Sequence, residues 1–104
     1  MGKNRDRLSI IAAILEAANS GSNKTHIMFG ANLSFRSLEK YLTIALNSGL
    51  IQYDAFRYHL TERGHAFLKE YKSFEARYAG AQKMLEALCN ERERFARFCE
   101  YPGK

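Results

Sequence analysis

The chain has 104 residues, which suits one compact domain with at most an appendage and argues against a large catalytic fold. Apolar residues make up 46 % and charged residues 26 %, a composition typical of globular proteins and not of disordered ones. Sixteen basic against eleven acidic residues give a net charge of +5, so a polyanion such as nucleic acid is the first partner class to consider. Because the single proline is Pro102, the chain is expected to be mostly helical.

Two helices are predicted in the first thirty residues. The first covers residues 5–20, and its apolar side chains recur about every 3.6 residues. They are Leu8, Ile11, Ile14, Leu15 and Ala18. A polar cluster around Gly21 ends this helix. A second, short helix from Lys24 to Phe29 is expected to end at Gly30, where the chain would turn left-handed.

A third helix is predicted over roughly residues 34–48, with Ser34 as its N-cap and Gly49 as its stop. Its inward face would carry Leu38, Leu42, Ala45 and Leu46. A short helix, a glycine-containing turn and a longer helix are the outline of a helix-turn-helix, whose second helix enters the DNA major groove.

Residues 50–60 alternate in apolar and polar character on both sides of the pair Asp54-Ala55, which predicts a small β-hairpin. Asp-Ala is a poor turn pair, so the loop length stays open. A hairpin directly after the third helix would form a wing. Residues 1–60 are therefore predicted to be a winged helix-turn-helix DNA-binding domain.

The rest of the chain, residues 61–104, is predicted to be one long helix that begins at an N-cap, Thr61, and continues to about Phe98. Its apolar or amphipathic residues recur at alternating spacings of four and three, with Gly64 and Arg92 as exceptions, which is typical of a coiled-coil seam. If unbroken, such a helix would be about 57 Å long, whereas the preceding residues form a body only about 25–30 Å across. Half of the helix would therefore overhang.

An overhanging apolar stripe predicts a second copy of the chain that covers it, and hence a homodimer. The interface would be formed by Phe74, Tyr78, Ala81, Leu85, Leu88 and Phe95. The alternative is that Gly80 breaks the helix and lets its end fold back on the first domain. The spacing alone leaves the relative direction of the two helices open.

The sequence offers little for catalysis or metal binding. Cys89 and Cys99 would lie about 15 Å apart on one helix, too far for a disulfide bond between them, and lone thiols suit a reducing compartment. Together with three histidines they match no zinc signature, and no phosphate-binding loop is present. We therefore expect no enzyme activity, no metal and no cofactor.

The chain is also expected to be neither secreted nor bound to a membrane. Its basic start and the apolar residues that follow look like a signal peptide, but Glu16 interrupts the apolar stretch. No apolar run has the length of a membrane span. The expected location is the cytoplasm.

Four stretches carry a family resemblance in their order and spacing. They are Lys24–Ser34, Lys40-Tyr41-Leu42, Asn47-Ser48-Gly49-Leu50-Ile51 and Leu60-Thr61-Glu62-Arg63-Gly64. Over about residues 5–90 the chain resembles the archaeal winged-helix proteins of the Sulfolobus 10a type. The resemblance implies a mostly α fold, in which a winged helix-turn-helix is followed by a long helix that pairs as an antiparallel coiled coil. It also implies a dimeric protein of the nucleoid that binds double-stranded DNA.

The third helix supplies the first candidates for DNA contacts. With its apolar face inward, Arg36, Ser37, Lys40 and Thr43 would project outward, and Ser34 would lie at the helix N-terminus, which attracts phosphate. Arg36 is suited to reading guanine edges, and Lys40 to pairing with phosphate. Phe35 and Tyr41 are expected to pack in the core.

Four further basic residues are weaker candidates. Lys24 at the start of the second helix and Arg57 in the wing would bracket the groove, while Arg5 and Arg7 could contact phosphates from the first helix. Residues 22–60 hold four basic against two acidic residues, a net charge of only +2 for each chain. So few cations predict modest, salt-sensitive binding of low sequence specificity.

Two other functions remain open: a sequence-specific transcriptional regulator with a winged helix, and a winged-helix module that binds another protein. RNA is a further possible ligand, because the same basic residues could contact it.

Overall fold

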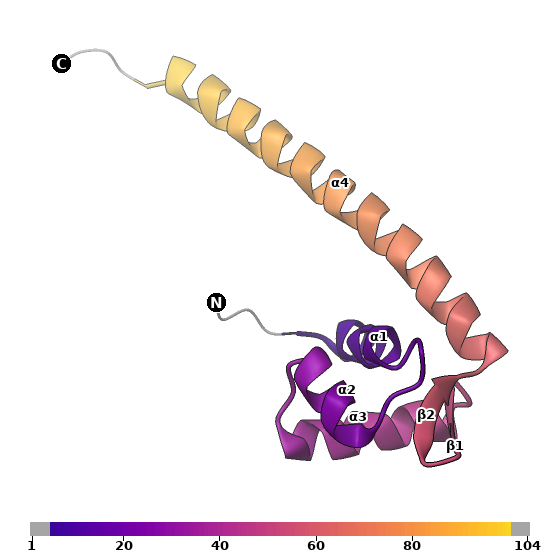
Figure 1. Cartoon of the computed structure of the whole chain (residues 1–104). Helices are drawn as coiled ribbons and strands as arrows, with labels where there is room; N and C mark the ends of the chain where they lie inside the picture. Colours follow the sequence, from indigo (N-terminus) through magenta and orange to yellow (C-terminus); the bar gives the residue numbers. More distant parts are fainter. Residues whose placement is uncertain (1–4, 101–104) are drawn as a thin grey trace. The chain divides into compact units, whose positions relative to one another are not determined.

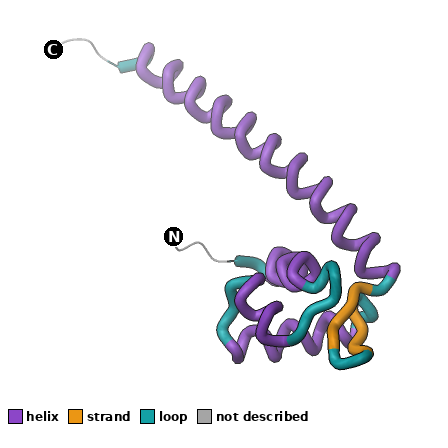
Figure 2. Tube along the Cα trace, in the orientation of Figure 1, coloured by secondary structure: helices purple, strands orange, loops and turns teal. Residues whose placement is uncertain are grey.

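The computed structural model describes residues 5–100, which divide into two compact units, residues 5–71 and residues 72–100. The first unit contains α1 (Arg7–Ala17), α2 (Lys24–Gly30), α3 (Phe35–Asn47), β1 (Ile51–Asp54) and β2 (Arg57–Leu60) (Figure 1). It also contains the first turns of α4 (Glu62–Phe98), and the second unit consists of the remaining turns. The predicted order of three helices, a hairpin and one long helix is confirmed (Figure 2).

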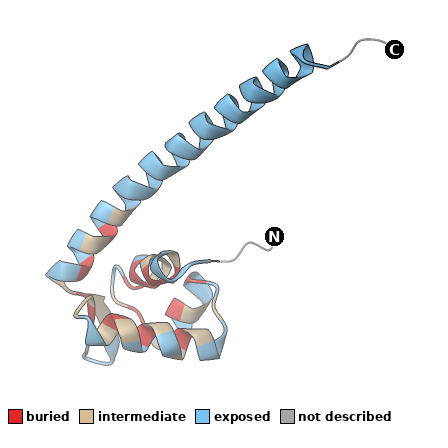
Figure 3. Cartoon of the chain, turned by 180° about the vertical axis from the view of Figure 1, so that it is seen from behind, coloured by how far each residue is buried: buried red, intermediate tan, exposed pale blue. Residues whose placement is uncertain are grey.

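The core of the first unit lies between α1, α2, α3 and the hairpin. Its largest fully buried side chains are Ile14, Leu15, Ile27, Leu38 and Ile51. In Figure 3 the buried segments of the helices face one another, while their outer faces are exposed. Leu8, which belongs to the apolar pattern that predicted α1, is not part of the core. It lies in the first turn of α1, where it is exposed and lines an open groove with Leu50 and Phe67.

Helix α1 is shorter than predicted at its C-terminal end, because the chain leaves the helix after Ala17. Ser22 Oγ donates a hydrogen bond of 2.9 Å to the Ala17 carbonyl, and Gly21 has a φ of 88°. At the other end Asp6 acts as the N-cap and accepts a hydrogen bond of 2.8 Å from the Ser9 amide. Both ends of α1 are thus closed by polar side chains of the flanking segments.

Helix α2 includes Gly30, so the predicted left-handed turn at this residue is wrong. The left-handed residue is Asn32, with a φ of 56°. Gly30 has a different role, since a Cβ added to it would lie 3.0 Å from the Cβ of Ala17. A glycine at this position therefore allows α2 to approach α1 closely.

Helix α3 agrees with its prediction. Ser34 is its N-cap, and the Ser34 hydroxyl accepts a hydrogen bond of 3.1 Å from the Ser37 amide. Gly49 follows the helix with a φ of 78°, as expected of a stop residue. The buried residues of α3 are Leu38, Leu42 and Ala45, and Leu46 is half-buried. The expectation for Phe35 is wrong, because its side chain is 61 % exposed on the first turn.

The predicted hairpin is present, but its turn lies one residue later than Asp54-Ala55. Asp54 pairs with Arg57, so the two-residue loop is Ala55-Phe56. This register pairs Ile51 with Leu60, the two strand residues that are buried in the core. Burial of these two side chains sets the register, because a slip of one residue would turn them toward solvent.

Helix α4 begins as predicted, with Thr61 Oγ1 accepting a hydrogen bond of 3.0 Å from the Gly64 amide. The α4 residues buried in the first unit are Gly64 and Leu68. The helix continues through Gly80 to Phe98, so the alternative prediction of a break at this glycine is wrong. Every residue from Lys72 to Glu100 is exposed (Figure 3). Among the described helices, none combines the length and the apolar character that crossing a membrane requires.

Candidate nucleic-acid interface

The outer face of α3 presents two basic side chains that are separated by one helical turn. Arg36 and Lys40 are both exposed, and their spacing of four residues places them on the same face. Arg36 has no hydrogen-bond or ion-pair partner among residues 5–100. Lys40 Nζ lies 5.1 Å from the ring centroid of Tyr41, which is half-buried against the core. This face therefore offers two cations to a ligand.

The N-terminus of α3 lies at the same end as Arg36. The Ser34 hydroxyl is engaged with the Ser37 amide, and Ser37 itself is half-buried. The backbone amides of Phe35 and Arg36 belong to the first turn, which has no acceptor within the helix. A phosphate group could accept hydrogen bonds from these amides. The Ser34 hydroxyl thus caps the helix, while the structure leaves the predicted contacts of Ser34 and Ser37 with DNA as predictions.

Lys24, which was predicted to bracket the groove, pairs with a residue of α3. Its ammonium group lies 2.7 Å from Glu39 Oε2, and both side chains are about two-fifths exposed, at 41 % and 44 %. The hydrogen bond to Glu39 raises the pKa of Lys24, against a smaller opposing effect of burial. The same ammonium lies 5.9 Å from the centroid of the exposed Phe35 ring. Lys24 and Glu39 therefore cancel each other's charge at the edge of α3.

Arg57 is exposed on the wing, where a backbone carbonyl accepts a hydrogen bond from it. Its guanidinium donates a hydrogen bond of 3.3 Å to the Gly21 carbonyl, and Asp54 is its neighbour across the hairpin. Because the guanidinium has further N–H groups, Arg57 can still reach a phosphate. The nearby carboxylate of Asp54 reduces the net charge of this end of the wing.

The two arginines near the N-terminus have different surroundings. Arg5 donates hydrogen bonds of 2.9 and 3.3 Å to the carbonyls of Ala31 and Asn32, so it satisfies the backbone that follows α2. Arg7 is exposed and has no partner among residues 5–100. Arg7 is thus the freer of the two for a phosphate contact.

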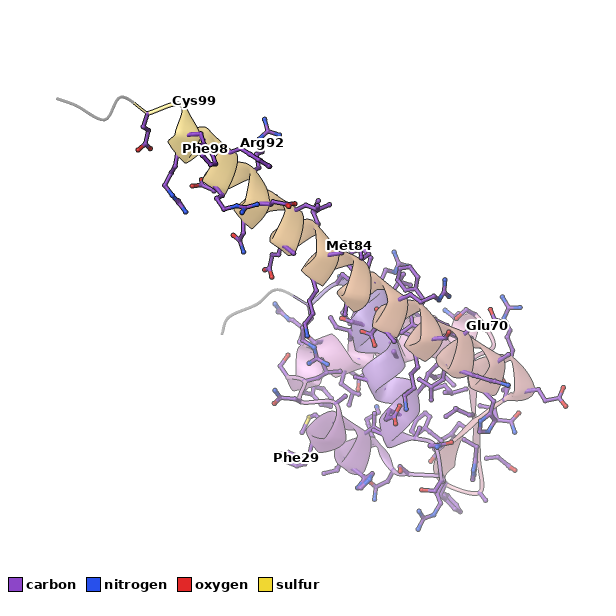
Figure 4. All side chains as sticks on the ribbon, turned by 90° about the horizontal axis from the view of Figure 1, so that it is seen from above. Phe29, Glu70, Met84, Arg92, Phe98 and Cys99 are labelled. Atoms are coloured by element: carbon purple, nitrogen blue, oxygen red, sulfur yellow. The ribbon has the colours of Figure 1, made fainter. Side chains whose placement is uncertain are left out.

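Three residues near this surface were not among the predicted site residues. Glu39 neutralises Lys24, and Phe35 exposes its ring beside Arg36. Phe56 occupies the wing tip and is 85 % exposed. Alternation in the hairpin could have indicated Phe56, whereas the pairing of Lys24 with Glu39 depends on the packing of α2 against α3. A third exposed aromatic ring, Phe29, projects from the end of α2 in Figure 4.

Within residues 5–100, no three side chains of His, Cys, Asp or Glu gather in a way that could hold a metal ion. Both cysteines are exposed free thiols.

Residues 4–79 match the family described as winged helix-turn-helix. The chain belongs to this family. A relative described as the uncharacterized protein MJ0287 of Methanocaldococcus jannaschii is 33 % identical over 73 residues, which cover 68 % of this chain and 75 % of that protein. The expected similarity to the Sulfolobus 10a type is confirmed at the level of the fold.

Solved structures share the fold at low sequence identity. Sso10a-2, described as a DNA-binding protein from Sulfolobus solfataricus, superposes with a TM-score of 0.61 at 22 % identity, covering 93 % of this chain and 99 % of that one. A MarR family protein of Mycobacterium tuberculosis, Rv2887, gives a TM-score of 0.61 at 17 % identity, covering 88 % and 69 % of the two chains. ZitR of Lactococcus lactis superposes with a TM-score of 0.57 at 19 % identity, covering 94 % of this chain and 75 % of that one.

Proposed function

We propose that this winged-helix protein binds double-stranded DNA as a homodimer, with low sequence specificity, and organises DNA in the nucleoid. The observation that carries the proposal is the exposed face of α3, where Arg36 and Lys40 lie one turn apart in the helix that a helix-turn-helix inserts into the major groove. The DNA-binding protein Sso10a-2 has the same fold and supports this choice of ligand.

The proposed low specificity follows from the composition of the α3 surface. Base readout uses long side chains that make bidentate hydrogen bonds, and here Arg36 is the exposed arginine of α3. The ammonium group of Lys24 forms an ion pair with Glu39, and Arg5 donates hydrogen bonds to backbone carbonyls. The remaining contacts from Lys40, Arg57 and Arg7 suit phosphates, which carry no sequence information.

The proposed dimer rests on α4 beyond Tyr71. The predicted seam residues Phe74, Tyr78, Leu85, Leu88 and Phe95 are between 45 % and 61 % exposed in the single chain. Ala81 is exposed as well. Apolar side chains repeated along one helix are stabilised when a second helix packs knobs into holes against them. We therefore assign the part of α4 beyond Tyr71, within the predicted segment 61–104, to dimerisation, and the first unit, with the predicted domain of residues 1–60, to DNA binding.

The test is the affinity for a random-sequence duplex of about 30 base pairs, measured by fluorescence anisotropy from about 50 to 300 mM salt. A dimer that neutralises about six phosphates, three from each chain, should give a log–log slope of about −5. The double variant Arg36→Glu, Lys40→Glu should lose this binding and remain dimeric. A matched control, Lys69→Glu with Lys83→Glu, makes the same charge change on α4.

Three results would each contradict a part of the proposal. Equal losses in the two double variants would show that overall charge matters and that α3 is not the site. A selected sequence that binds more than about a thousandfold more tightly than random DNA would identify a sequence-specific regulator. Absence of binding to any duplex or RNA would favour a module that binds another protein.

A further inference from the structure

The tip of the wing has a backbone conformation that its residues do not favour. Ala55 and Phe56 have φ angles of 52° and 62°. Turns with two successive positive φ angles connect antiparallel strands well, but they normally contain asparagine, aspartate or glycine, because a larger side chain crowds the backbone. The ring of Phe56 gains little from packing, since it is 85 % exposed. Replacement of Phe56 by glycine would therefore favour the folded chain.

The rest of the hairpin holds this tip firmly. The rings of Tyr53 and Tyr58 pair across the strands with their centroids 4.6 Å apart. Ser22 extends the sheet, with backbone hydrogen bonds of 3.1 and 2.8 Å that join it to Tyr58 in both directions. Because the strands are tied together and tied to the loop before α2, the Phe56 ring is presented at the end of a stiff support.

An exposed aromatic residue held at a cost to stability is typical of a functional site. The surroundings of Phe56 indicate what the ring meets. Arg57 follows it directly, and α3, with Arg36 and Lys40 on its outer face, immediately precedes the hairpin. A planar apolar group beside cations matches a polyanion with an aromatic interior, which is the chemistry of a nucleic-acid duplex. Major and minor grooves alternate along a duplex, so a hairpin next to a helix in the major groove meets a minor groove.

We propose that Phe56 is a wedge that enters the minor groove, inserts between adjacent base pairs and bends the duplex. The proposal rests on the proposed DNA-binding function and adds to it a deformation of the DNA. Apolar side chains placed between base steps partly unstack them, and the bent duplex then contacts more of the protein. Arg57, next to the wedge, neutralises a phosphate at the site of bending.

A wedge makes the protein sensitive to the stiffness of DNA and not to its base identities. Pyrimidine–purine steps such as TA unstack easily, and a mismatched pair unstacks more easily still. The protein should therefore bind a duplex with a central mismatch more tightly than the fully paired duplex. This preference requires Phe56 and does not depend on Arg36 or Lys40.

The test compares the wild-type protein with Phe56→Gly on two duplexes of about 20 base pairs, one fully paired and one with a central mismatch. Affinity is measured by anisotropy, and bending by energy transfer between dyes at the two ends. Phe56→Gly should melt at the wild-type temperature or higher. Its affinity should fall about fivefold or more, because the stacking contact is lost together with the contacts that the bend adds. The bend and the preference for the mismatch should disappear.

Two further variants make the comparison specific. Phe56→Trp keeps an aromatic wedge and should retain both the bend and the preference for the mismatch. Phe98→Ala removes a ring that is 80 % exposed on α4 and should change neither. If Phe56→Gly bends DNA and prefers the mismatch as the wild type does, the wedge is wrong and DNA binding stands. If the wild type binds neither duplex, the proposed function itself fails.

Discussion

Gly64 and Gly80 lie in the same helix, but the space around their α-carbons differs. A Cβ added to Gly64 would overlap the carbonyl oxygen of Leu50, so the absence of a side chain lets α4 pack directly on the backbone before β1. A Cβ added to Gly80 would meet no atom within 4 Å. The first glycine is thus required by packing, and the second only weakens the helix.

Substitution of each glycine by alanine should therefore have opposite effects. Gly64→Ala should lower the free energy of unfolding by about 2 kcal/mol or more, because the backbone must move to admit the methyl group. Gly80→Ala should raise it by up to about 1 kcal/mol through helix propensity alone. Urea unfolding followed by circular dichroism at one protein concentration measures both. A stabilised Gly64→Ala variant would contradict the contact with Leu50.

For single residues, the sequence predicted the helix N-caps correctly but did not predict the side-chain contacts between residues that are far apart in the chain. Ser34 and Thr61 were predicted as N-caps, because the pairing of a short hydroxyl with an amide three residues on is local. The interactions of Arg5 with Ala31 and of Lys24 with Glu39 span 26 and 15 residues. These interactions depend on how the helices pack. The sequence therefore did not show that Arg5 and Lys24, both predicted to contact DNA, also have partners within the protein.

At the scale of elements, the ion pair between α2 and α3 limits the charge that the helix-turn-helix offers. Glu39 lies on α3 between Arg36 and Lys40 in sequence, and it holds Lys24 at 2.7 Å. This hydrogen bond raises the pKa of Lys24 above its ordinary value of 10.5, so Lys24 stays charged throughout the neutral range. The contribution of the ion pair to stability is small, since both side chains are exposed.

Glu39→Gln should therefore tighten DNA binding. The change removes a carboxylate from each α3 and frees one Lys24 in each chain of the dimer for a phosphate, so the salt slope should steepen by about two and the affinity at low salt should rise severalfold. The double variant Lys24→Gln, Glu39→Gln should return to the original slope. Glu86→Gln on α4 makes an equal charge change and serves as the control in the same titration. Equal gains from Glu39→Gln and Glu86→Gln would contradict this role of the pair.

The wing shows why an element can be predicted while its geometry is not. The alternation of residues 50–60 correctly indicated a hairpin. The turn was expected at Asp54-Ala55, because apolar and polar residues alternate on both sides of this pair, whereas the structure places Ala55-Phe56 there. Alternation does not fix the register, which depends on the burial of Ile51 and Leu60.

At the scale of the whole molecule, the proposed dimer makes α4 the assembly element. The variant Leu85→Asp with Leu88→Asp places two carboxylates in the seam and should yield monomers in sedimentation experiments, because burial of unpaired charges is costly. Ala87→Asp with Asn90→Asp adds the same groups to the opposite face of the helix and should stay dimeric. A dimer that persists with the seam variant would place the interface elsewhere.

The native cysteines can test the antiparallel direction that the family resemblance implies. Cys99 continues the seam beyond Phe95 and is an exposed thiol. In a parallel pair, two copies of Cys99 would face each other within the roughly 6 Å that a disulfide bond spans between α-carbons. In an antiparallel pair centred near Leu85, they would lie about 42 Å apart, and the two copies of Cys89 about 12 Å apart.

Mild oxidation should therefore leave the protein without intermolecular disulfide bonds if the helices are antiparallel. The Cys89→Ala variant isolates Cys99, and a maleimide that labels this thiol in the native protein shows that it is reactive. On a non-reducing gel the oxidised variant should then run as a single chain, although sedimentation shows a dimer. A covalent dimer through Cys99 would identify a parallel coil, and the two DNA-binding units would then lie at the same end of the coil, where one stretch of DNA could contact both.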